Sequence, residues 1–375
     1  MFKAGQIMPI IRSTLFKSLL SGVVWLHLFF ISGLLFFIWT YGDRTPLGTF
    51  LLFGPRWIWG IPFLPLVVLA IIFSCRLLIP LFLTLILFLF PIMQFSIPLR
   101  FPFNNNLSAN KIRVLSYNIG RMAKNDPDFP ALLEGARVDI VALQECTIDQ
   151  SDQKKWRDLN WHLATNHTVS TCLLSRFPIL KTEVRDPKEI WKMGGSGVIV
   201  RYHLNTNEGP IYVVNLHLET PREGIEAMMD EWRMIASSLW HLRLGETGKL
   251  LSSAQWLNPP EMKDKIFVRE FESKVAKDWV TETPHPVIVT GDFNMPSDSR
   301  IYREFWSDFD NTYKVAGFGF GNTKWTRWFG IRIDHILVRE KDWDVINAWT
   351  LPGAGHTDHI PLMAEIIRPP SGGAK

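Results

Sequence analysis

The chain has 375 residues, and its 40 lysines and arginines against 36 aspartates and glutamates give a formal net charge of +4. This charge is unevenly placed, because residues 1–100 hold seven basic residues and one acidic residue, a balance of +6, whereas the other 275 carry −2. The composition is that of a folded protein and excludes disorder, a collagen-like repeat and a small disulfide scaffold.

The first hundred residues contain three apolar stretches, at about 15–39, 58–74 and 77–97. A helix of roughly 20 apolar residues crosses a bilayer, so we predict a membrane anchor of about three transmembrane helices in residues 1–100. A cleaved signal peptide is the alternative for the first stretch. Its apolar part exceeds the roughly 7–15 residues of a signal-peptide core, however, and two further stretches remain.

The basic residues of the anchor predict its orientation. Lys3, Arg12 and Lys17 precede the first stretch and Arg76 separates the last two. Because lysine and arginine are retained in the cytoplasm, the amino terminus is expected inside, and three spans then place the rest of the chain outside. A re-entrant hairpin formed by the last two stretches would reverse this expectation.

The remainder of the chain reads as a polar linker at 101–110, a folded domain at 111–368 and a disordered tail at 369–375. Many short strands with few parallel crossover units predict an α/β fold of two packed sheets flanked by helices. The predicted strands are 111–117, 138–143, 171–175, 195–203, 210–217, 286–290, 332–338 and 361–367. The predicted helices are 128–135, 223–244 and 261–280.

Three cysteines are too few for a disulfide framework or a thiolate metal site. Cys75 lies in an apolar run, and Cys146 and Cys172 lie in strand-like stretches. Cysteine is among the residue types most often buried as a free thiol, so we predict three buried free thiols.

Polar side chains gather where the predicted strands end, and a strand end fixes a side chain at the rim of a sheet. Glu145, Asp358 and the amide oxygen of Asn118 are hard ligands that suit Mg²⁺, Mn²⁺ or Ca²⁺. Singly each signal is weak, because a carboxylate at a strand end is usually a solvated residue or a helix cap. The segments concerned are Ser116–Asn118, Leu143–Glu145, Asn215–Glu219, Val289–Asn294, Arg332–His335 and Gly355–His359.

In this order the segments resemble the endonuclease/exonuclease/phosphatase superfamily over about residues 111–367. The resemblance implies a four-layer α/β sandwich and divalent-metal-dependent hydrolysis of a phosphoester, with Mg²⁺ or Mn²⁺ as cofactor. It implies Glu145 as the principal metal ligand, Asn118 beside the metal and phosphate, and Asp358 completing the site. Membrane-attached bacterial members look most similar, which places the chain in a bacterial cytoplasmic membrane.

The resemblance also implies the catalytic residues. Asp292 would orient or deprotonate the attacking water, with Asn294 positioning it. His359 would contact the phosphoryl oxygens, held by Asp334, and His217 would stabilise the transition state or assist the leaving group. These roles agree with the chemistry, since cations offset the charge that develops on a phosphoester and a carboxylate draws a proton from water.

Two segments differ from what the compact members of this superfamily lead us to expect. The stretch 245–265 is additional, and we expect either a surface loop or a lid that contacts substrate or membrane. The region 166–176 offers no acidic partner for His217, which weakens a general-acid role for that residue.

Four residues are candidates for substrate contact. Arg176 follows a strand and is a candidate phosphate clamp, with a structural role as the alternative. Trp325, Arg327 and Trp328 interleave aromatic and basic side chains, which suits base stacking or a lipid headgroup interface, with simple loop packing as the alternative.

The charge balance weighs against duplex DNA as substrate, because DNA-binding domains usually present a basic face and residues 101–375 carry −2. A ten-residue linker also keeps the domain within ~35 Å of the bilayer. We therefore expect a phosphoesterase whose partners are membrane lipids and a phosphorylated substrate, including a lipid-linked one. A tethered nuclease and a non-catalytic interaction module are the alternatives, and no protein partner is predicted.

Overall fold

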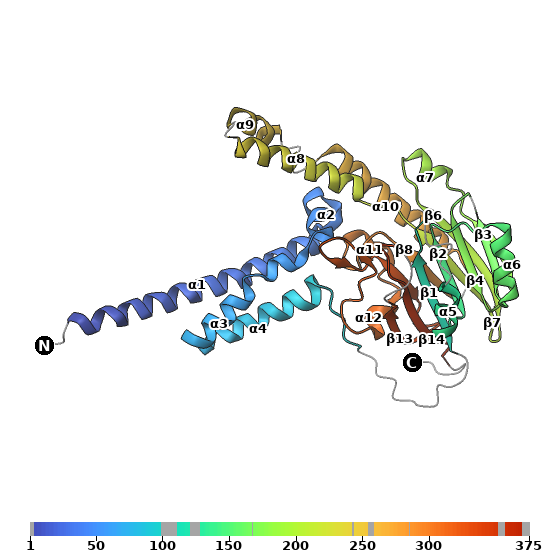
Figure 1. Cartoon of the computed structure of the whole chain (residues 1–375), viewed down its shortest axis with the longest axis horizontal. Helices are drawn as coiled ribbons and strands as arrows, with labels where there is room; N and C mark the ends of the chain where they lie inside the picture. The colour runs from blue at the N-terminus through green and yellow to red at the C-terminus, as the bar shows by residue number, and fades with distance from the viewer. Residues whose placement is uncertain are drawn as a thin grey trace.

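The computed structural model describes residues 4–98, 111–120, 128–166, 168–241, 244–253, 259–284, 286–351 and 357–369. The predicted linker at 101–110 and residues 370–375 of the predicted tail lie outside the described residues. The chain forms a bundle of apolar helices that extends from one side of a sheet-containing domain (Figure 1).

Three segments of the first hundred residues are long and apolar enough to cross a membrane: Thr14–Thr40, Arg56–Phe73 and Cys75–Ile92. The third segment ends at Ile92, before the predicted residue 97. Beyond it, Ser96 is extended and pairs with the backbone of Gly319. The helices are α1 (Ala4–Thr40), the short connecting α2 (Pro46–Phe53), α3 (Phe63–Phe73) and α4 (Leu78–Leu87), which continues as a π-helical turn (Phe88–Ile92).

The surface of these helices is apolar. Leu26, Phe29, Ile72 and Ile79 are each at least 65% exposed, and large contiguous apolar surfaces mark membrane or protein contact sites. Cys75 is a free thiol, as predicted, but it is exposed, so the prediction that it is buried is wrong: it begins the short turn between α3 and α4, where few protein side chains cover it.

Two six-stranded mixed sheets make up most of the remaining chain. The strands of the first are β1 (Ile112–Asn118), β2 (Ile140–Gln144), β3 (His162–Asn166), β4 (Thr171–Ser175), β13 (Asp344–Thr350) and β14 (Leu362–Ile367). The strands of the second are β5 (Ile179–Val184), β6 (Val198–Thr206), β7 (Gly209–His217), β8 (Val287–Asp292), β9 (Asp310–Asn311) and β12 (Asp334–Val338). Their orders are β13-β14-β1-β2-β4-β3 and β5-β6-β7-β8-β12-β9.

The two sheets pack face to face with helices outside. Apolar side chains of both sheets, including Val114, Ala142, Val213 and Ile288, form one buried cluster between them. Because the central strands are covered on both faces, they read as near-continuous apolar runs rather than alternating ones. The predicted sandwich of two packed sheets flanked by helices is confirmed, and in these two sheets β3, β5, β9 and β13 are additional to the predicted strands.

The outer layers are helical. Leu133 and Trp156 join α5 and α6 to the outer face of the first sheet, and Ala276 and Trp306 join α10 and α11 to the outer face of the second. The helices of this part are α5 (Phe129–Gly135), α6 (Gln150–Asp158), α7 (Lys188–Lys192), α8 (Arg222–Trp240), α9 (Leu244–Ser253), α10 (Pro260–Thr281), α11 (Arg300–Trp306) and α12 (Thr312–Ala316).

Helices α8 and α10 form a long arm that carries α9 near its tip and projects from the domain beside the anchor (Figure 1). The described part of the stretch 245–265 is therefore largely helical, and the alternative of a surface loop is wrong there. Phe50 of α2 packs against Trp232 of α8, with ring centroids 4.4 Å apart, so the arm contacts the anchor through these side chains.

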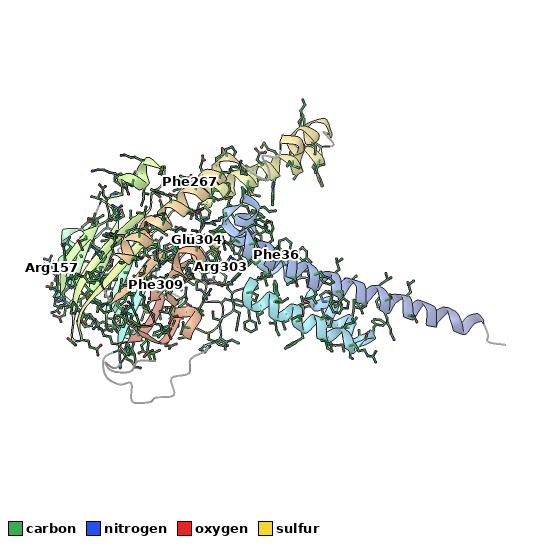
Figure 2. The ribbon with its side chains drawn as sticks, turned by 180° about the vertical axis from the view of Figure 1, so that it is seen from behind. Phe36, Arg157, Phe267, Arg303, Glu304 and Phe309 are labelled. Atoms are coloured by element: carbon green, nitrogen blue, oxygen red, sulfur yellow. A yellow bond between two sulfur atoms is a disulfide. The ribbon has the colours of Figure 1, made fainter. Side chains whose placement is uncertain are left out.

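Buried polar contacts join the anchor to the two-sheet domain. The Asp43 carboxylate accepts hydrogen bonds from the backbone of Arg300 and Ile301 at the start of α11 and forms an ion pair with Arg269 at 3.2 Å, where both side chains are fully buried. Arg56 pairs with Asp298 at 2.8 Å, and both are less than 10% exposed. The anchor is thus packed against the domain, with Arg303 and Glu304 at the junction (Figure 2).

Candidate active site

Three adjacent strands of the second sheet place three polar side chains in a row. β7 runs parallel to β8 and pairs His217 with Asp292, while β12 runs antiparallel to β8 and pairs Asp334 with Asp292. Gly291 has a φ of +142°, and a Cβ there would lie 1.9 Å from the carbonyl oxygen of Leu216, so only glycine fits before Asp292. The sheet register alone brings these three predicted residues together.

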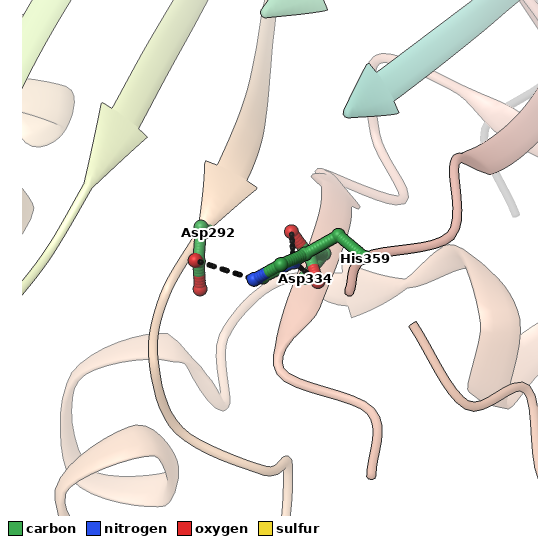
Figure 3. A group of neighbouring side chains, drawn as sticks. All are labelled: Asp292, Asp334 and His359. Carbon is green, nitrogen blue, oxygen red and sulfur yellow. Dashed lines mark hydrogen bonds and ion pairs between the residues drawn. The ribbon is translucent and has the colours of Figure 1, made fainter. Parts of the chain in front are cut away.

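His359 lies between the two aspartates of this row (Figure 3). Its Nδ1 is 3.0 Å from Oδ2 of Asp334, and its Nε2 is 3.6 Å from Oδ2 of Asp292. Burial acts to lower the pKa of His359, but the charges of Asp334 and Asp292 outweigh it and raise the pKa to about 9. The protonated imidazole is therefore favoured at neutral pH. Its Nε2–H then faces Asp292, and the Lys324 ammonium 2.8 Å away, which can only donate, pairs with Asp358 instead.

The two aspartates respond differently to the same environment. Burial acts to raise the pKa of Asp292, but the positive charges of His359 and His217 and a hydrogen bond from the backbone of Asn294 hold it below its usual value. Burial raises the pKa of Asp334, and the charge of His359 opposes this only in part. Asp292 is thus the carboxylate that stays ionised, whereas Asp334 is committed to holding the imidazole.

The first sheet brings Asn118 and Glu145 to the same place. β1 and β2 are parallel and pair Asn118 with Gln144, so their carboxyl ends lie at one edge. The Asn118 amide Nδ2 donates to Glu145 Oε1 and to Asp292 Oδ2, both at 3.1 Å. This amide therefore joins the two sheets across the site. Gln144 Nε2 adds a second link, donating to Asn215 Oδ1 at 2.7 Å.

Glu145 has a left-handed backbone with a φ of +53°, and Asn294 has a φ of +49°. Such conformations cost non-glycine residues about 1–3 kcal/mol and cluster at functional sites. Asn294 is fixed by its amide, which donates to the carbonyl of Leu218 at 2.7 Å. This contact ties the ends of β7 and β8 together, so Asn294 orients the turn beside Asp292 in addition to any contact with water.

A disulfide joins Cys146, next to Glu145, to Cys172 of β4. The prediction that these cysteines are free thiols is wrong. The two lie 26 residues apart in the sequence, and no spacing rule indicates the pairing; the antiparallel register of β2 and β4, which pairs Leu143 with Cys172, brings them together. The bond fixes the turn that carries Glu145.

Asp358 lies beside the other predicted ligands without contacting them. Its carboxylate pairs with Lys324 Nζ at 2.8 Å and is about half exposed. Burial acts to raise its pKa, but Lys324 holds it below the usual value. Lys324 Nζ is also 2.8 Å from His359 Nε2, so it is a site residue that the sequence reasoning did not assign. The Thr357 hydroxyl donates to the carbonyl of Asn118 at 3.3 Å and holds this segment at the site.

His217 has one carboxylate within ion-pair distance among the described residues: its Nε2 lies 3.7 Å from Asp292 Oδ2. Its segment is held from behind by Glu272 of α10, whose carboxylate accepts from the backbone of Gly197 at 2.8 Å and of Glu219 at 2.6 Å. Burial raises the pKa of Glu272 to about 7. Sequence spacing gives no signal for Glu272, because it lies on the buried face of a long helix.

Arg176 is placed far from the site. β4 is antiparallel to β2 and pairs Ser175 with Ile140, so Arg176 follows β4 at the edge opposite Glu145. Its guanidinium donates to the carbonyls of Leu159 and Asn160, pairs with Glu134 and lies 4.0 Å from the centre of the Trp161 ring. The prediction that Arg176 contacts substrate is wrong, and its role is structural.

The aromatic and basic segment forms a hairpin beside the site. Its strands are β10 (Lys324–Trp325) and β11 (Gly330–Ile331). The backbone N–H of Trp325 donates to the carbonyl of Asp358 at 2.8 Å. Trp325 and Trp328 are 51% and 69% exposed, and Arg327 lies over the Trp328 ring at 5.3 Å. These side chains are therefore free to meet a ligand, and packing of the loop does not account for them.

The donor set fits a divalent cation. Asp292, Asp334 and His359 place ligand atoms within 4.8 Å of one another among the described residues, and Glu145 is joined to Asp292 through one amide. Carboxylate oxygens of this kind suit Mg²⁺ or Mn²⁺ rather than zinc. The Asn118 amide oxygen, which was predicted as a ligand, instead accepts from the backbone N–H of Gly120 at 3.1 Å. Because Asp334 is hydrogen-bonded to His359, Glu145 and Asp292 are the carboxylates best placed to hold the ion.

A family model covers the strands that carry this arrangement. The model described as "Endonuclease/Exonuclease/phosphatase family" matches residues 115–359, well over half of the chain. Similar solved structures include the mannosyl-6-phosphatase of Bacteroides thetaiotaomicron (14% identity; 68% of this chain and 99% of that chain; TM-score 0.44). The catalytic domain of human Nocturnin is similar at 16% identity, 70% and 95% coverage and a TM-score of 0.44. No curated protein sequence matches the chain.

Proposed function

The chain belongs to the endonuclease/exonuclease/phosphatase family, and from this premise we propose that it is a membrane-anchored, divalent-metal-dependent phosphoesterase. Its substrate is a phosphodiester, phosphomonoester or pyrophosphate of a lipid or envelope compound, cleaved at the membrane surface. The observation that carries the proposal is the cluster at the sheet edge, where a protonated His359 faces an ionised Asp292 beside Glu145 and Asn118.

Each residue has a role that follows from its surroundings. Glu145 and Asp292, held together by the Asn118 amide, would hold Mg²⁺ or Mn²⁺, which when bound supplies Lewis-acid stabilisation of the phosphoryl oxygens. Asp292, held ionised, accepts a proton from an attacking water. His359, kept positive by Asp334, donates from Nε2 to a phosphoryl oxygen.

Two further side chains act on the charge around the phosphoryl group. Lys324 lies 2.8 Å from His359 Nε2 and adds positive charge on the side of Asp358. His217, on the other side of Asp292, stabilises the developing charge. Preorganised donors of this kind stabilise charge most in a buried site, and Asp292, Asp334 and His359 are buried.

The membrane assignment rests on the anchor and on the disulfide. Three apolar segments precede the domain, and the basic residues among them favour an inside amino terminus. Disulfides persist in oxidising compartments and are rare in the cytosol, so the Cys146–Cys172 bond supports an extracytoplasmic catalytic domain. We propose an integral protein of a bacterial cytoplasmic membrane with this orientation, with membrane lipids as its partners.

The test is a panel of substrates with the full chain in detergent and Mg²⁺ or Mn²⁺. Phospholipids and lipid pyrophosphates are compared with plasmid DNA. Hydrolysis of a lipid phosphoester should fall about 10²–10⁴-fold in Asp292→Asn and stay unchanged in the surface control Asp308→Asn, with both variants folded by melting temperature. Turnover retained in Asp292→Asn would refute the site, and faster nicking of plasmid DNA would favour a tethered nuclease.

A further inference from the structure

A crevice lies between the anchor and the catalytic domain, next to the hairpin that borders the active site. Its volume is about 310 Å³, at the lower end of the range for ligand pockets. The anchor contributes Arg56, Trp57 and Gln94, and the domain contributes Trp325, Trp328 and Arg332. Trp325 is also bonded to the segment of the active site through Asp358.

Arg332 is a buried cation without an anionic partner. Its side chain is 4% exposed, and it forms no ion pair with a carboxylate of the described residues. One nitrogen donates to the carbonyl of Phe320 at 2.7 Å, the guanidinium lies over the Tyr313 ring at 4.5 Å, and Nε has no hydrogen-bond partner. Arg56, by contrast, is fully engaged with Asp298 and backbone carbonyls.

A second cation, which is not itself buried, lines the adjoining crevice. Lys314 lines a space of about 600 Å³ that shares Gln94 and Ser297 with the first crevice. Its ammonium donates to the carbonyl of Ser297 at 3.3 Å and makes no ion pair with a described carboxylate. Desolvation by the surrounding protein atoms, and then the charge of Arg332, lowers the pKa of Lys314 to about 8. The nearby carboxylate is Asp298, which lines the second crevice and attracts both cations but is already paired with Arg56 at 2.8 Å. A buried charge that lacks its own counter-ion costs several kcal/mol, so an anion beside Arg332 would be stabilised.

The anchor side of these crevices is apolar and lies at the membrane boundary. Three apolar segments end or begin beside the domain, at Thr40, Arg56 and Ile92, and the second crevice is lined there by Leu35, Ile38, Trp39, Phe90 and Pro91. Tryptophan side chains such as Trp57 are enriched at the headgroup level of a bilayer. A soluble anion would contact the cations but not the apolar wall. A lipid would contact the cations with its phosphate and the apolar wall with its chains.

We propose that the paired crevices bind one phosphate-bearing membrane lipid, with its phosphate at Arg332 and Lys314 and its chains along the anchor helices. The phosphate supplies the missing counter-charge through charge-assisted hydrogen bonds. The proposal concerns binding outside the cluster of Glu145, Asp292 and His359, so it goes beyond the proposed function and holds whether or not the bound lipid is cleaved.

The experiment measures the melting temperature of the full chain in uncharged detergent with EDTA, so that no metal-dependent turnover occurs. The probes are dioctanoyl phosphatidic acid, dioctanoylglycerol and inorganic phosphate. At roughly tenfold above Kd, phosphatidic acid should raise the melting temperature by about 3–5 °C, whereas dioctanoylglycerol and phosphate each shift it by less than ~1 °C. Equal shifts with phosphate alone would identify a free-anion site and overturn the proposal, as would no shift with phosphatidic acid.

The variants are Arg332→Met and Lys314→Met, with exposed Arg233→Met as the matched control. Arg332→Met should weaken phosphatidic acid binding about tenfold or more, and the control should not change it. Without lipid, Arg332→Met should melt no lower than the unaltered chain, since it removes an unpaired buried charge. A lower melting temperature with an undiminished lipid shift would show that Arg332 is purely structural, and would overturn the proposal.

Discussion

Replacing Asp43 by asparagine tests whether the anchor is part of the folded catalytic unit. Asp43 is fully buried and is the ion-pair partner of Arg269, which is fully buried too, at 3.2 Å. Two other nitrogens of Arg269, Nε and Nη1, have no hydrogen-bond partner. The amide introduced by Asp43→Asn would keep an oxygen for the backbone donors of α11 but would leave the arginine without this counter-charge.

Removing one partner of a buried ion pair costs about 3–5 kcal/mol. Each kcal/mol lowers the melting temperature of a domain of this size by roughly 2–4 °C, so Asp43→Asn should melt about 6–20 °C lower. The surface carboxylate of Asp308, which pairs with Lys277 and is 54% exposed, provides the control. An exposed pair contributes about 0–1 kcal/mol, so Asp308→Asn should lower the melting temperature by less than ~4 °C.

The assay is the intrinsic fluorescence of the full chain in detergent during heating, with hydrolysis measured well below the transition. Arg269 also donates to the carbonyl of Asn294 at 3.1 Å, two residues from Asp292, so the loss should reach the site and lower the turnover rate. The double variant Asp43→Asn with Arg269→Met should recover part of the stability. A melting temperature for Asp43→Asn within ~2 °C of the Asp308→Asn control would refute the reasoning.

Three further predictions concern the site. Glu145→Gln should raise the Mg²⁺ or Mn²⁺ concentration for half-maximal hydrolysis at least tenfold, and an unchanged metal requirement would remove Glu145 from the metal site. In EDTA, the pKa of His359 is about 9 in the folded chain against 6.5 in the unfolded chain. Its contribution to stability is therefore complete below pH 6.5 and is lost as the pH rises through 9, about 3 kcal/mol in all. Asp334→Asn should remove most of this pH dependence, measured as the free energy of unfolding in denaturant titrations at several pH values. Replacing Cys146 and Cys172 by alanine should cost about 3–4 kcal/mol for a loop of this length, and in intact cells neither cysteine should react with a maleimide unless a reductant is added.

The sequence predicts those parts of the site that depend on strand ends. Asn118, Glu145, His217 and Asp292 lie where buried apolar runs stop and Asp334 lies where one begins, and sheet register then brings them together. The two-sheet fold follows from the same apolar runs.

The remaining features depend on contacts between distant segments. The Cys146–Cys172 bond arises from the pairing of β2 with β4. Arg176 lies at the sheet edge opposite Glu145 because β4 is antiparallel to β2. A run of apolar residues does not reveal the direction of a strand. Lys324 reaches His359 only because β10 folds beside the last predicted motif. A pattern read along the chain contains residue spacing but not strand direction.

The Asp43 contact also has a consequence for how the protein is made. Asp43 accepts from Arg300 and Ile301, more than 250 residues later in the chain, and chains are synthesised from the amino terminus. The apolar helices are therefore synthesised long before α11, and β8 and α11 complete their packing against a surface that already exists. If these helices span a bilayer as we propose, the two-sheet domain closes its junction at the membrane, and a chain begun after residue 100 would have to fold without this first partner.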